Sequence, residues 1–216
     1  MKSRRFLVFL LVIAILFFTT TNRPAINTID NIAYVIAMGL DVGDNAKIKL
    51  SLQIAIPSSN TSSESVSSTS HSSSTVVKTV DCNTLNTGIN LINAYISKKL
   101  SLAFCKIVVF SEELASHDII NYIASLTNDL EVRPTCNMLI SKCEAKYFLE
   151  NSKPILDDLS SKYYEIENSS KKNTGYTEPI TLLDFYNCYY DTFGEPYAIL
   201  GNINNSYIEN VRISCI

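Results

Sequence analysis

The stretch TIDNIAYVIAMGLDVGDNAKIKLSLQIAIPS, residues 28–58, decides the fold of this chain. Two runs inside it, 32–40 and 46–56, are rich in β-branched and long apolar residues, which suit a pleated strand. Between them lies DVGDN, residues 41–45, whose Gly and Asn tolerate a positive φ and whose Asp residues bond to nearby backbone. The stretch therefore predicts a β-hairpin with a turn longer than two residues.

The two runs differ in the spacing of their apolar residues. In the second run every other residue from Ile48 to Ile56 is apolar, and the residues between them include Lys49, Ser51 and Gln53. This alternation predicts a strand with one buried face and one face in water. The first run is apolar on both faces, so we expect it to lie deeper in the sheet and to be covered by later segments.

Length and charge narrow the class of protein. A chain of 216 residues is long enough to bury one good core. Its formal net charge is −3, and the sequence shows no basic patch of the kind that nucleic acids require. The composition therefore indicates a globular protein with no nucleic-acid partner.

The N-terminus has the order of charged and apolar residues that directs a chain to a membrane. The basic start MKSRR is followed by an unbroken apolar run from Phe6 to Phe18. As a helix this run would be roughly 20 Å long, less than the roughly 30 Å hydrocarbon core of a bilayer. We interpret residues 1–22 as a signal or membrane-anchor segment, and the sequence leaves open whether it is cleaved. Residues after Asn22 are expected outside the cytoplasm.

Six cysteines are spread through the chain, and in an exported protein such residues can pair as disulfides. None of them forms a C-x-x-C pair, and the chain is long enough to have its own core. We therefore expect most of them to be unpaired and buried as small apolar side chains. The sequence has two histidines, His71 and His117, and His71 lies in a Ser-rich tract. We predict no zinc site.

A polar loop and a helix follow the hairpin. Residues 58–75 are almost wholly Ser and Thr, which predicts a disordered loop because such a tract buries too little apolar area to offset its ordering. Asn83 or Thr84 can cap a helix whose apolar spacing continues to Leu100. Lys98 and Lys99 are expected in the last turn of this helix, where cations favour the helix dipole.

Another helix is predicted after Ser111, which can cap it, with Glu112 and Glu113 in the first turn. Its buried stripe is expected at positions 119, 120, 123 and 126, and His117 is expected to be exposed.

A third capping signal lies near the C-terminus, where Thr181 and Asp184 match a capping box. The remaining predicted elements are strands at 75–80, 102–110, 135–141, 197–200 and 207–214, and helices at 143–151, 155–167 and 182–190, with a polar loop at 168–175. Together these patterns predict an α+β fold, in which a mixed β-sheet opened by a hairpin is covered by several amphipathic helices.

The motifs of common active sites are absent from the sequence. It contains no Gly-rich phosphate-binding loop, no H-E-x-x-H, no G-x-S-x-G and no Ser/His/Asp set. Glu112 and Glu113 are neighbours at a helix start, so their side chains should point apart and should not form an acid–base pair. From residue chemistry we predict no catalytic, cofactor-binding or metal-binding residues, no cofactor and no enzymatic activity.

Five pieces of the sequence, in this order, resemble the N-terminal domain of the Ger(x)C family, the C subunit of spore germinant receptors. They are the hairpin TIDNIAYVIAMGLDVGDNAKIKLSLQIAIPSS, the segment LSLAFCKIVVFSEELA, the turn LEVRPTC, the helix CEAKYFLEN and the segment EPITLLDFY. The resemblance spans residues 29–204, and the ordered series is far more specific than any single piece. It assigns residues 23–200 to this domain and 201–216 to the start of a second domain.

The resemblance implies a membrane-attached protein on the outer face of the spore inner membrane. In this family the C subunit works with two integral-membrane partners, the A and B subunits, in triggering germination by nutrients, and no enzymatic activity is attributed to it. Family members usually carry a lipobox that ends in an acylated Cys just before the region of Ile29. This chain has TTTN at 19–22 instead, so attachment is expected through the segment from Phe6 to Phe18. Members also continue into further domains, so a chain ending at Ile216 corresponds to a truncated form.

Two hypotheses of different classes follow. The first is a non-catalytic, membrane-associated subunit of a nutrient germinant receptor. The alternative is an exported solute-binding domain that binds a nutrient directly, which predicts a concave apolar pocket with a few convergent polar groups. An enzyme would instead require a pocket with coupled ionisable residues.

Overall fold

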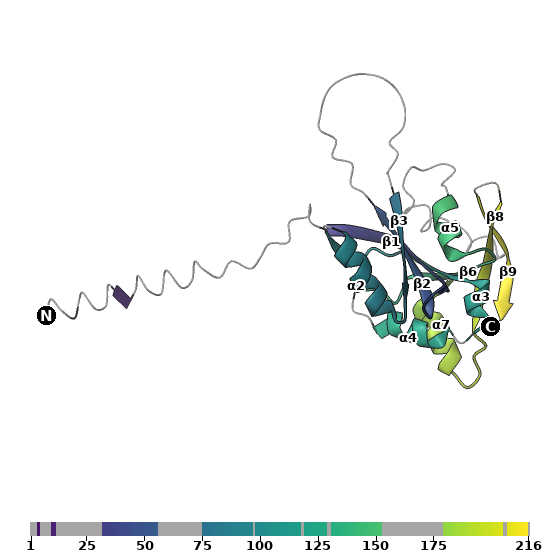
Figure 1. Cartoon of the computed structure of the whole chain (residues 1–216). Coiled ribbons are helices and arrows are strands. Elements are labelled where there is room, and N and C mark those ends of the chain that lie inside the picture. The colour runs from purple at the N-terminus through teal and green to yellow at the C-terminus, as the bar shows by residue number, and fades with distance from the viewer. Residues whose placement is uncertain are drawn as a thin grey trace, which may run out of the picture. The chain divides into compact units, whose positions relative to one another are not determined.

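The computed structural model describes residues 4, 10–11, 32–55, 75–96, 98–117, 119–128, 131–152, 179–204 and 207–215 (Figure 1). The chain divides into two compact units, Met1–Ile32 and Ala33–Ile216. In the described part, no helix has the length and apolar character needed to cross a bilayer. Several predicted segments lie outside the described residues: most of the apolar run at 6–18, the Ser/Thr loop at 58–74, the helix at 155–167 and the polar loop at 168–175.

The predicted hairpin is confirmed. Strand β1 (Ile32–Val42) pairs antiparallel with β2 (Ile48–Ala55), with Leu40 opposite Leu50. The first strand runs two residues beyond its predicted end, so the connection is the five-residue segment 43–47. β2 then pairs antiparallel with β3 (Thr75–Cys82) along its whole length. These three strands form one side of the sheet.

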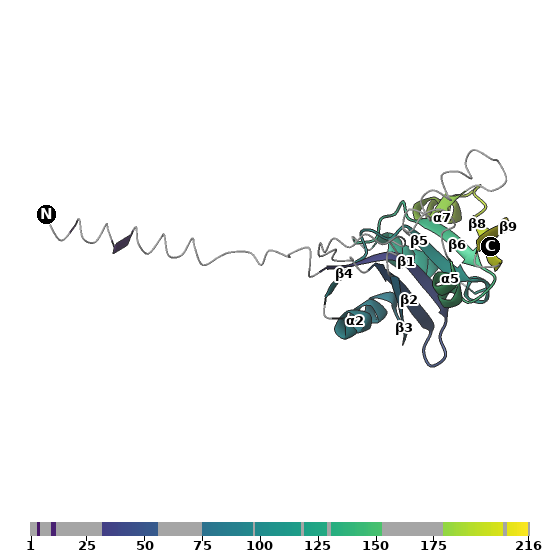
Figure 2. The ribbon, with the colours of Figure 1, turned by 90° about the horizontal axis from the view of Figure 1, so that it is seen from above.

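The described strands form one nine-stranded mixed sheet in the order β3-β2-β1-β5-β6-β8-β9, which can be followed across Figure 2. Its centre is parallel: β5 (Ile107–Ser111) lies beside β1, β6 (Asn137–Ser141) beside β5, and β8 (Tyr197–Asn204) beside β6. The short strands β4 (Lys99–Ser101) and β7 (Ile180–Thr181) pair with β1 and β6, and β9 (Tyr207–Cys215) pairs antiparallel with β8.

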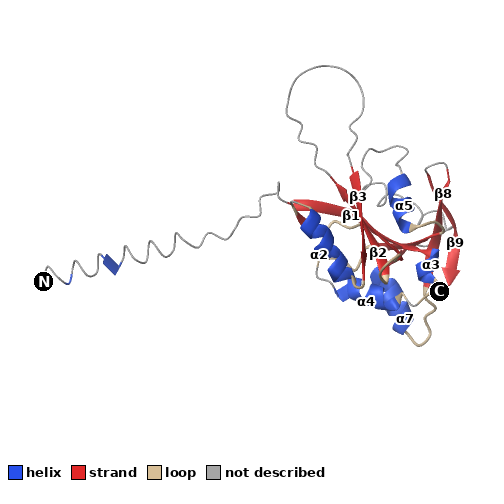
Figure 3. Ribbon diagram, in the orientation of Figure 1, coloured by secondary structure: helices blue, strands red, loops and turns tan. Residues whose placement is uncertain are grey.

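Helices cover both faces of the sheet (Figures 1 and 3). The larger apolar cluster joins one sheet face to α2 (Leu85–Tyr95), α4 (Ile120–Asn128) and α7 (Leu182–Tyr190). The smaller cluster joins the other face to α5 (Ala145–Asn151), with Phe148 fully buried. The predicted α+β fold, a mixed sheet opened by a hairpin and covered by amphipathic helices, is confirmed.

β1 lies in the interior of the sheet, as its apolar pattern predicted. Val35, Ala37 and Leu40 have no exposed surface. β1 also carries Gly39 at a point where α5 approaches closely. A Cβ added at Gly39 would lie 3.0 Å from Leu149 and 3.1 Å from the Cβ of Ala145, so the lack of a side chain allows this packing.

The prediction that β2 has one face in water was wrong. Ser51 is fully buried and Gln53 is 2 % exposed. Strands pair with β2 on both edges, and α5 covers the face that the alternation assigned to water. The polar side chains on that face therefore find protein partners: Ser51 Oγ lies 3.0 Å from Thr79 Oγ1, and Gln53 Nε2 donates to the Leu149 carbonyl at 3.4 Å.

The first long helix ends earlier than predicted. Asn83 and Thr84 were the two predicted N-cap residues, and Thr84 is the one that caps α2. Its Oγ1 accepts a hydrogen bond from the Thr87 backbone N–H at 3.3 Å. The helix ends at Tyr95 because Ile96 is already extended. Asn93 Oδ1 then accepts from the Leu100 N–H at 3.1 Å, and the chain turns into β4. Lys98 and Lys99 are therefore not in the last helical turn, which corrects that prediction.

The segment after α2 also differs from its predicted form. The strand predicted at 102–110 begins only at Ile107, because the residues before it form a turn closed by the Cys105 N–H and the Leu102 carbonyl at 3.0 Å. The helix predicted after Ser111 is two helices, α3 (Glu112–Ala115) and α4. The first ends at its C-cap residue Ser116, after which the His117 N–H bonds to the Leu114 carbonyl at 3.1 Å, three residues back instead of four.

The elements nearer the C-terminus match their predictions more closely. The capping box at Thr181 and Asp184 is present in both directions at the start of α7. β6 begins two residues later than predicted, and α5 begins at Ala145 instead of position 143. β8 and β9 fall where strands were predicted.

Candidate functional site

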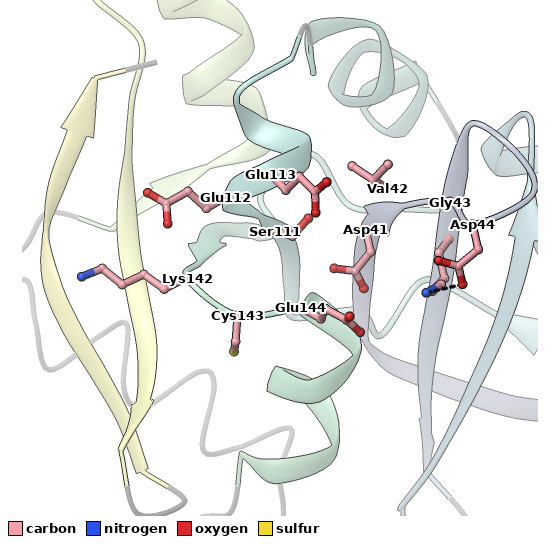
Figure 4. A pocket seen from close by; sticks show the side chains of 11 residues that line it. Asp41, Val42, Gly43, Asp44, Ser111, Glu112, Glu113, Lys142, Cys143 and Glu144 are labelled. Atoms are coloured by element: carbon pink, nitrogen blue, oxygen red, sulfur yellow. Dashed lines mark ion pairs between the residues drawn. The ribbon is translucent and has the colours of Figure 1, made fainter.

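The carboxyl ends of the parallel strands β1, β5 and β6 surround a pocket of about 460 Å³ (Figure 4). In open sheets with parallel strands this is the edge where ligands most often bind, because the chain leaves each strand for a helix there. The lining comes from three junctions: residues 41–44 with Lys49, residues 111–113 and residues 142–144. This pocket is the candidate site of the described part of the chain.

Asp41 is the most buried charged residue of the pocket, with 3 % of its surface exposed. Its two carboxylate oxygens accept hydrogen bonds from the backbone N–H groups of Ala145, at 2.6 Å, and Lys146, at 3.0 Å. Those N–H groups belong to the first turn of α5, where Glu144 at the N-cap position makes no side-chain capping bond. Asp41 therefore caps a helix that begins 104 residues later in the chain.

The surroundings of Asp41 act on its pKa in opposite directions. Burial of the carboxylate has the largest effect and raises the pKa above the ordinary Asp value. The hydrogen bonds from Ala145 and Lys146 lower it, the charge of Glu144 raises it, and a hydrogen bond with Ser111 lowers it. The net direction is upward. Asp41 is thus a buried acid that is held in place by backbone donors.

The second junction carries α3. Ser111 caps the helix as predicted, because its Oγ accepts from the Leu114 N–H at 3.3 Å. Glu112 and Glu113 occupy the first turn, and Figure 4 shows their carboxylates pointing to opposite sides. His117 follows α3 and is exposed, with its Nδ1 3.0 Å from the Glu113 carbonyl oxygen. This junction places acids at the mouth of the pocket, and the two glutamates do not face each other.

The pocket is acidic. Its lining holds five carboxylates, Asp41, Asp44, Glu112, Glu113 and Glu144, against the two lysines Lys49 and Lys142. Lys49 is already paired, since its Nζ lies 2.8 Å from Asp44 Oδ2, and this hydrogen bond raises the pKa of Lys49. Within the described residues no three His, Cys, Asp or Glu side chains are placed to hold a metal ion. The lining favours positively charged groups over anions.

Five cysteines, Cys82, Cys105, Cys136, Cys143 and Cys188, are free thiols, in line with the expectation that most are unpaired. Cys82, Cys105 and Cys136 are buried, and Cys143 and Cys188 are half-buried. Cys136 Sγ donates to Cys105 Sγ at 3.9 Å. That hydrogen bond and burial hold the pKa of Cys136 well above its usual value, which disfavours the reactive thiolate.

A second feature lies on the outer side of α7 and the turn that follows it. Tyr189, Tyr190 and Phe193 expose 47, 62 and 96 % of their surface, and the ring centroids of the two tyrosines are 5.3 Å apart. From Pro179 to Asn204 the sequence has three acids, Asp184, Asp191 and Glu195, and no Lys or Arg. We call these six residues the acidic aromatic surface. Clusters of exposed aromatic side chains mark sites of interaction with other molecules.

Sequence reasoning predicted no site residues, and it placed Asp41 in the hairpin turn. The structure puts Asp41 at the end of β1 and brings it to α5. No local pattern signals this contact, because the acceptor and its first donor are 104 residues apart in the chain. The aromatic residues of α7 are visible in the sequence as YNCYY, but the helical pattern alone does not show which of them stay exposed.

Comparisons with known proteins give one finding. Searches of curated proteins and of solved structures found no match to this chain. The family model described as "Spore germination protein N-terminal domain" matches residues 26–203. This match covers most of the chain and both features described above, so the chain belongs to the spore germination protein N-terminal domain family and has a role in spore germination.

Proposed function

We propose that this protein is a non-catalytic, membrane-associated subunit of a nutrient germinant receptor. The observation that carries the proposal is the family match over residues 26–203, together with the ordered resemblance to the receptor C subunit. In this role the domain lies on the outer face of the spore inner membrane and is attached through the N-terminal apolar segment. It contacts the integral-membrane A and B subunits and couples them to the nutrient response.

The chemistry of the pocket supports a non-catalytic role. Its one deeply buried acid, Asp41, is engaged by two backbone donors of α5, and its two adjacent glutamates point apart. General acid–base catalysis requires groups that can reach the same reacting atom, and this arrangement positions Asp41 to hold α5 instead. The role that the structure gives to Asp41 is therefore to join the end of β1 to the start of α5.

The acidic aromatic surface supports a partner-binding role. Tyr and Phe are enriched in the buried centres of protein interfaces, where their rigid rings supply much of the contact area. The segment that carries these rings has three acids, Asp184, Asp191 and Glu195, and no Lys or Arg, which favours a partner segment that carries Lys or Arg. We propose that this surface contacts an apolar, basic segment of the A or B subunit.

The alternative, an exported solute-binding domain, predicts an apolar pocket with a few polar groups. The pocket at the strand ends is lined mainly by charged and polar residues, which differs from that expectation. This pocket, in the described part of the chain, therefore lends no support to direct nutrient binding.

Gene deletion tests the proposed function. Spores that lack the gene should lose nutrient-triggered germination, and the wild-type gene should restore it. A trigger that bypasses the nutrient receptors should still germinate the deleted spores, which controls for general spore damage. Unchanged nutrient germination in the deleted strain would remove the receptor role.

Substitution of the acidic aromatic surface tests the partner contact. The double variant Tyr190→Asp with Phe193→Asp should lose co-purification of the membrane subunits from detergent-solubilised spore membranes. The matched control is Tyr147→Asp, because Tyr147 is 51 % exposed but lies on α5. Equal recovery of the partner subunits with both variants would place the contact elsewhere.

A further inference from the structure

A second exposed aromatic group lies at the end of the sheet where β1 begins. Tyr95, the last residue of α2, is 81 % exposed, and Phe104, between β4 and β5, is 48 % exposed. The Phe104 ring contacts Tyr34 of β1 edge-on, with centroids 5.0 Å apart. β4 pairs with β1, and the Leu100 N–H of β4 donates to Asn93 of α2. These two contacts hold the C-terminal end of α2 beside β1.

The charge of this region is opposite to that of the acidic aromatic surface. Residues 83–111 contain three Lys and no Asp or Glu, in a chain whose net charge is −3. Two of the lysines, Lys98 and Lys99, lie three and four residues after the end of α2, and Lys99 is exposed. We call Tyr34, Tyr95, Lys98, Lys99 and Phe104 the basic aromatic end. Exposed aromatic rings beside lysines are the side chains that settle at the headgroup level of an anionic bilayer.

Attachment through the N-terminal segment, as proposed above, would tether the domain at this end. β1 starts at Ile32, so the chain enters the sheet at the basic aromatic end. The segment from Thr19 to Asn31 links the apolar run to β1, and it spans at most about 45 Å when fully extended. A domain tethered through such a link stays near the bilayer, and the tether attaches at the end that carries the aromatic rings and lysines.

We propose that the basic aromatic end binds the surface of an anionic bilayer, with the rings of Tyr95 and Phe104 at the headgroup level and the two lysines against lipid phosphates. This inference rests on the proposed membrane attachment and adds an orientation to it. The acidic aromatic surface carries charges that anionic lipid repels, so it stays turned to protein partners.

The chain contains no Trp, which allows a direct test with a single fluorescent reporter. The full-length Tyr95→Trp variant is reconstituted into vesicles of phosphatidylglycerol and phosphatidylcholine, with or without bromine on the upper part of the acyl chains. Bromine quenches Trp only at close range, so we expect the emission to fall by about half or more. Equal emission in brominated and plain vesicles would overturn the proposal.

Phe193→Trp is the matched control, because Phe193 is 96 % exposed on the acidic aromatic surface. Its emission should be the same in both kinds of vesicle. Quenching of both reporters to the same extent would show that the domain has no preferred orientation and would overturn the proposal. Adding Lys98→Gln and Lys99→Gln to the Tyr95→Trp variant should reduce its quenching at least twofold, and undiminished quenching would overturn the role given to the lysines.

Flotation of the same vesicles separates this inference from the proposed function. The full chain should float with the vesicles, with or without the lysine substitutions, because attachment depends on the N-terminal segment. A chain that does not float overturns membrane attachment and the orientation together. A chain that floats while the reporter at position 95 stays unquenched leaves the proposed function intact and overturns the orientation alone.

Discussion

Asp41 shows how one buried carboxylate can connect two distant parts of the chain. It lies at the end of β1, and both of its oxygens accept hydrogen bonds from the first turn of α5. A capping interaction contributes about 0.5–2 kcal/mol, and a buried donor left without an acceptor costs about 1–3 kcal/mol. We expect Asp41→Ala to lower the free energy of unfolding by about 1–3 kcal/mol, measured by denaturant unfolding of the full chain in mild detergent. A loss no greater than that of an exposed control, Glu113→Ala, would contradict this capping role.

The raised pKa of Asp41 predicts a specific dependence of stability on pH. Because the folded state binds the proton more tightly than the unfolded state, the stability that this group contributes is full below the ordinary Asp pKa of 3.8. This contribution to stability decreases as the pH rises through the raised pKa of Asp41 in the folded state. Above that pKa it no longer changes with pH. The stability advantage of wild type over Asp41→Asn should therefore shrink as the pH rises. Melting temperatures of both proteins from pH 3.5 to 7 test this. An advantage that grows with pH would show that the hydrogen bonds outweigh burial and lower the pKa.

The thiols provide another test at the scale of single residues. Cys82, Cys105 and Cys136 are buried. Burial raises the pKa of Cys82. The hydrogen bond with Cys105, together with burial, raises the pKa of Cys136. A maleimide reagent should therefore label Cys143 and Cys188 first and reach the buried three only after denaturation. Mass spectrometry of labelled peptides identifies the sites. Early labelling of Cys136 in the native protein would contradict the packing described for it.

At the scale of elements, α2 lies so close to β2 and β3 that its interior glycine cannot be enlarged. A Cβ added at Gly88 would lie 2.6 Å from Cys82 Sγ and 2.8 Å from Leu50 Cδ2. Replacing Gly by Ala within a helix usually gains up to about 1 kcal/mol, but overpacking costs about 1–3 kcal/mol. We expect Gly88→Ala to lower the melting temperature, whereas the exposed control Asn90→Ala should keep or raise it.

A second substitution makes this prediction specific to the contact. Cys82→Ala removes the sulfur atom that the new methyl group would meet, so the double variant should recover part of the loss caused by Gly88→Ala in the presence of Cys82. If Gly88→Ala instead melts above wild type, the close approach of α2 to the sheet would be wrong.

Elements were predictable from the sequence where their signals are local. The hairpin, the Ser111 cap and the capping box at Thr181 and Asp184 each depend on residues within a few positions, and each is present. The predictions failed where distant segments decide. The alternation in β2 predicts that Gln53 faces water, but α5 covers it. The apolar spacing that continues to Leu100 predicts a longer helix, but Leu100 lies in β4, which pairs with β1. The role of Asp41 also depends on a distant segment, because only the folded structure shows that it caps α5.

At the scale of the whole molecule, the two groups of exposed aromatic residues lie in segments whose charges have opposite signs. The acidic aromatic surface on α7 has three carboxylates and no cations in its segment, and the basic aromatic end has lysines and no acids in its segment. Local charge of opposite sign suits partners of different chemistry, a basic protein segment for the first and anionic lipid for the second. The net charge of −3 conceals this division, because it sums over both regions.

The sheet order predicts where the molecule is most stable. β1 has a neighbour on each edge, helices on both faces and several residues with no exposed surface, whereas β3 ends the order on one side. Backbone amides open for exchange most rarely where packing and hydrogen bonding are complete on all sides. We therefore expect hydrogen–deuterium exchange, measured by mass spectrometry on the full chain in detergent, to be slowest in β1 and β5 and clearly faster in β3. Exchange in β3 that is as slow as in β1 would mean that another segment covers this edge and that the domain does not end there.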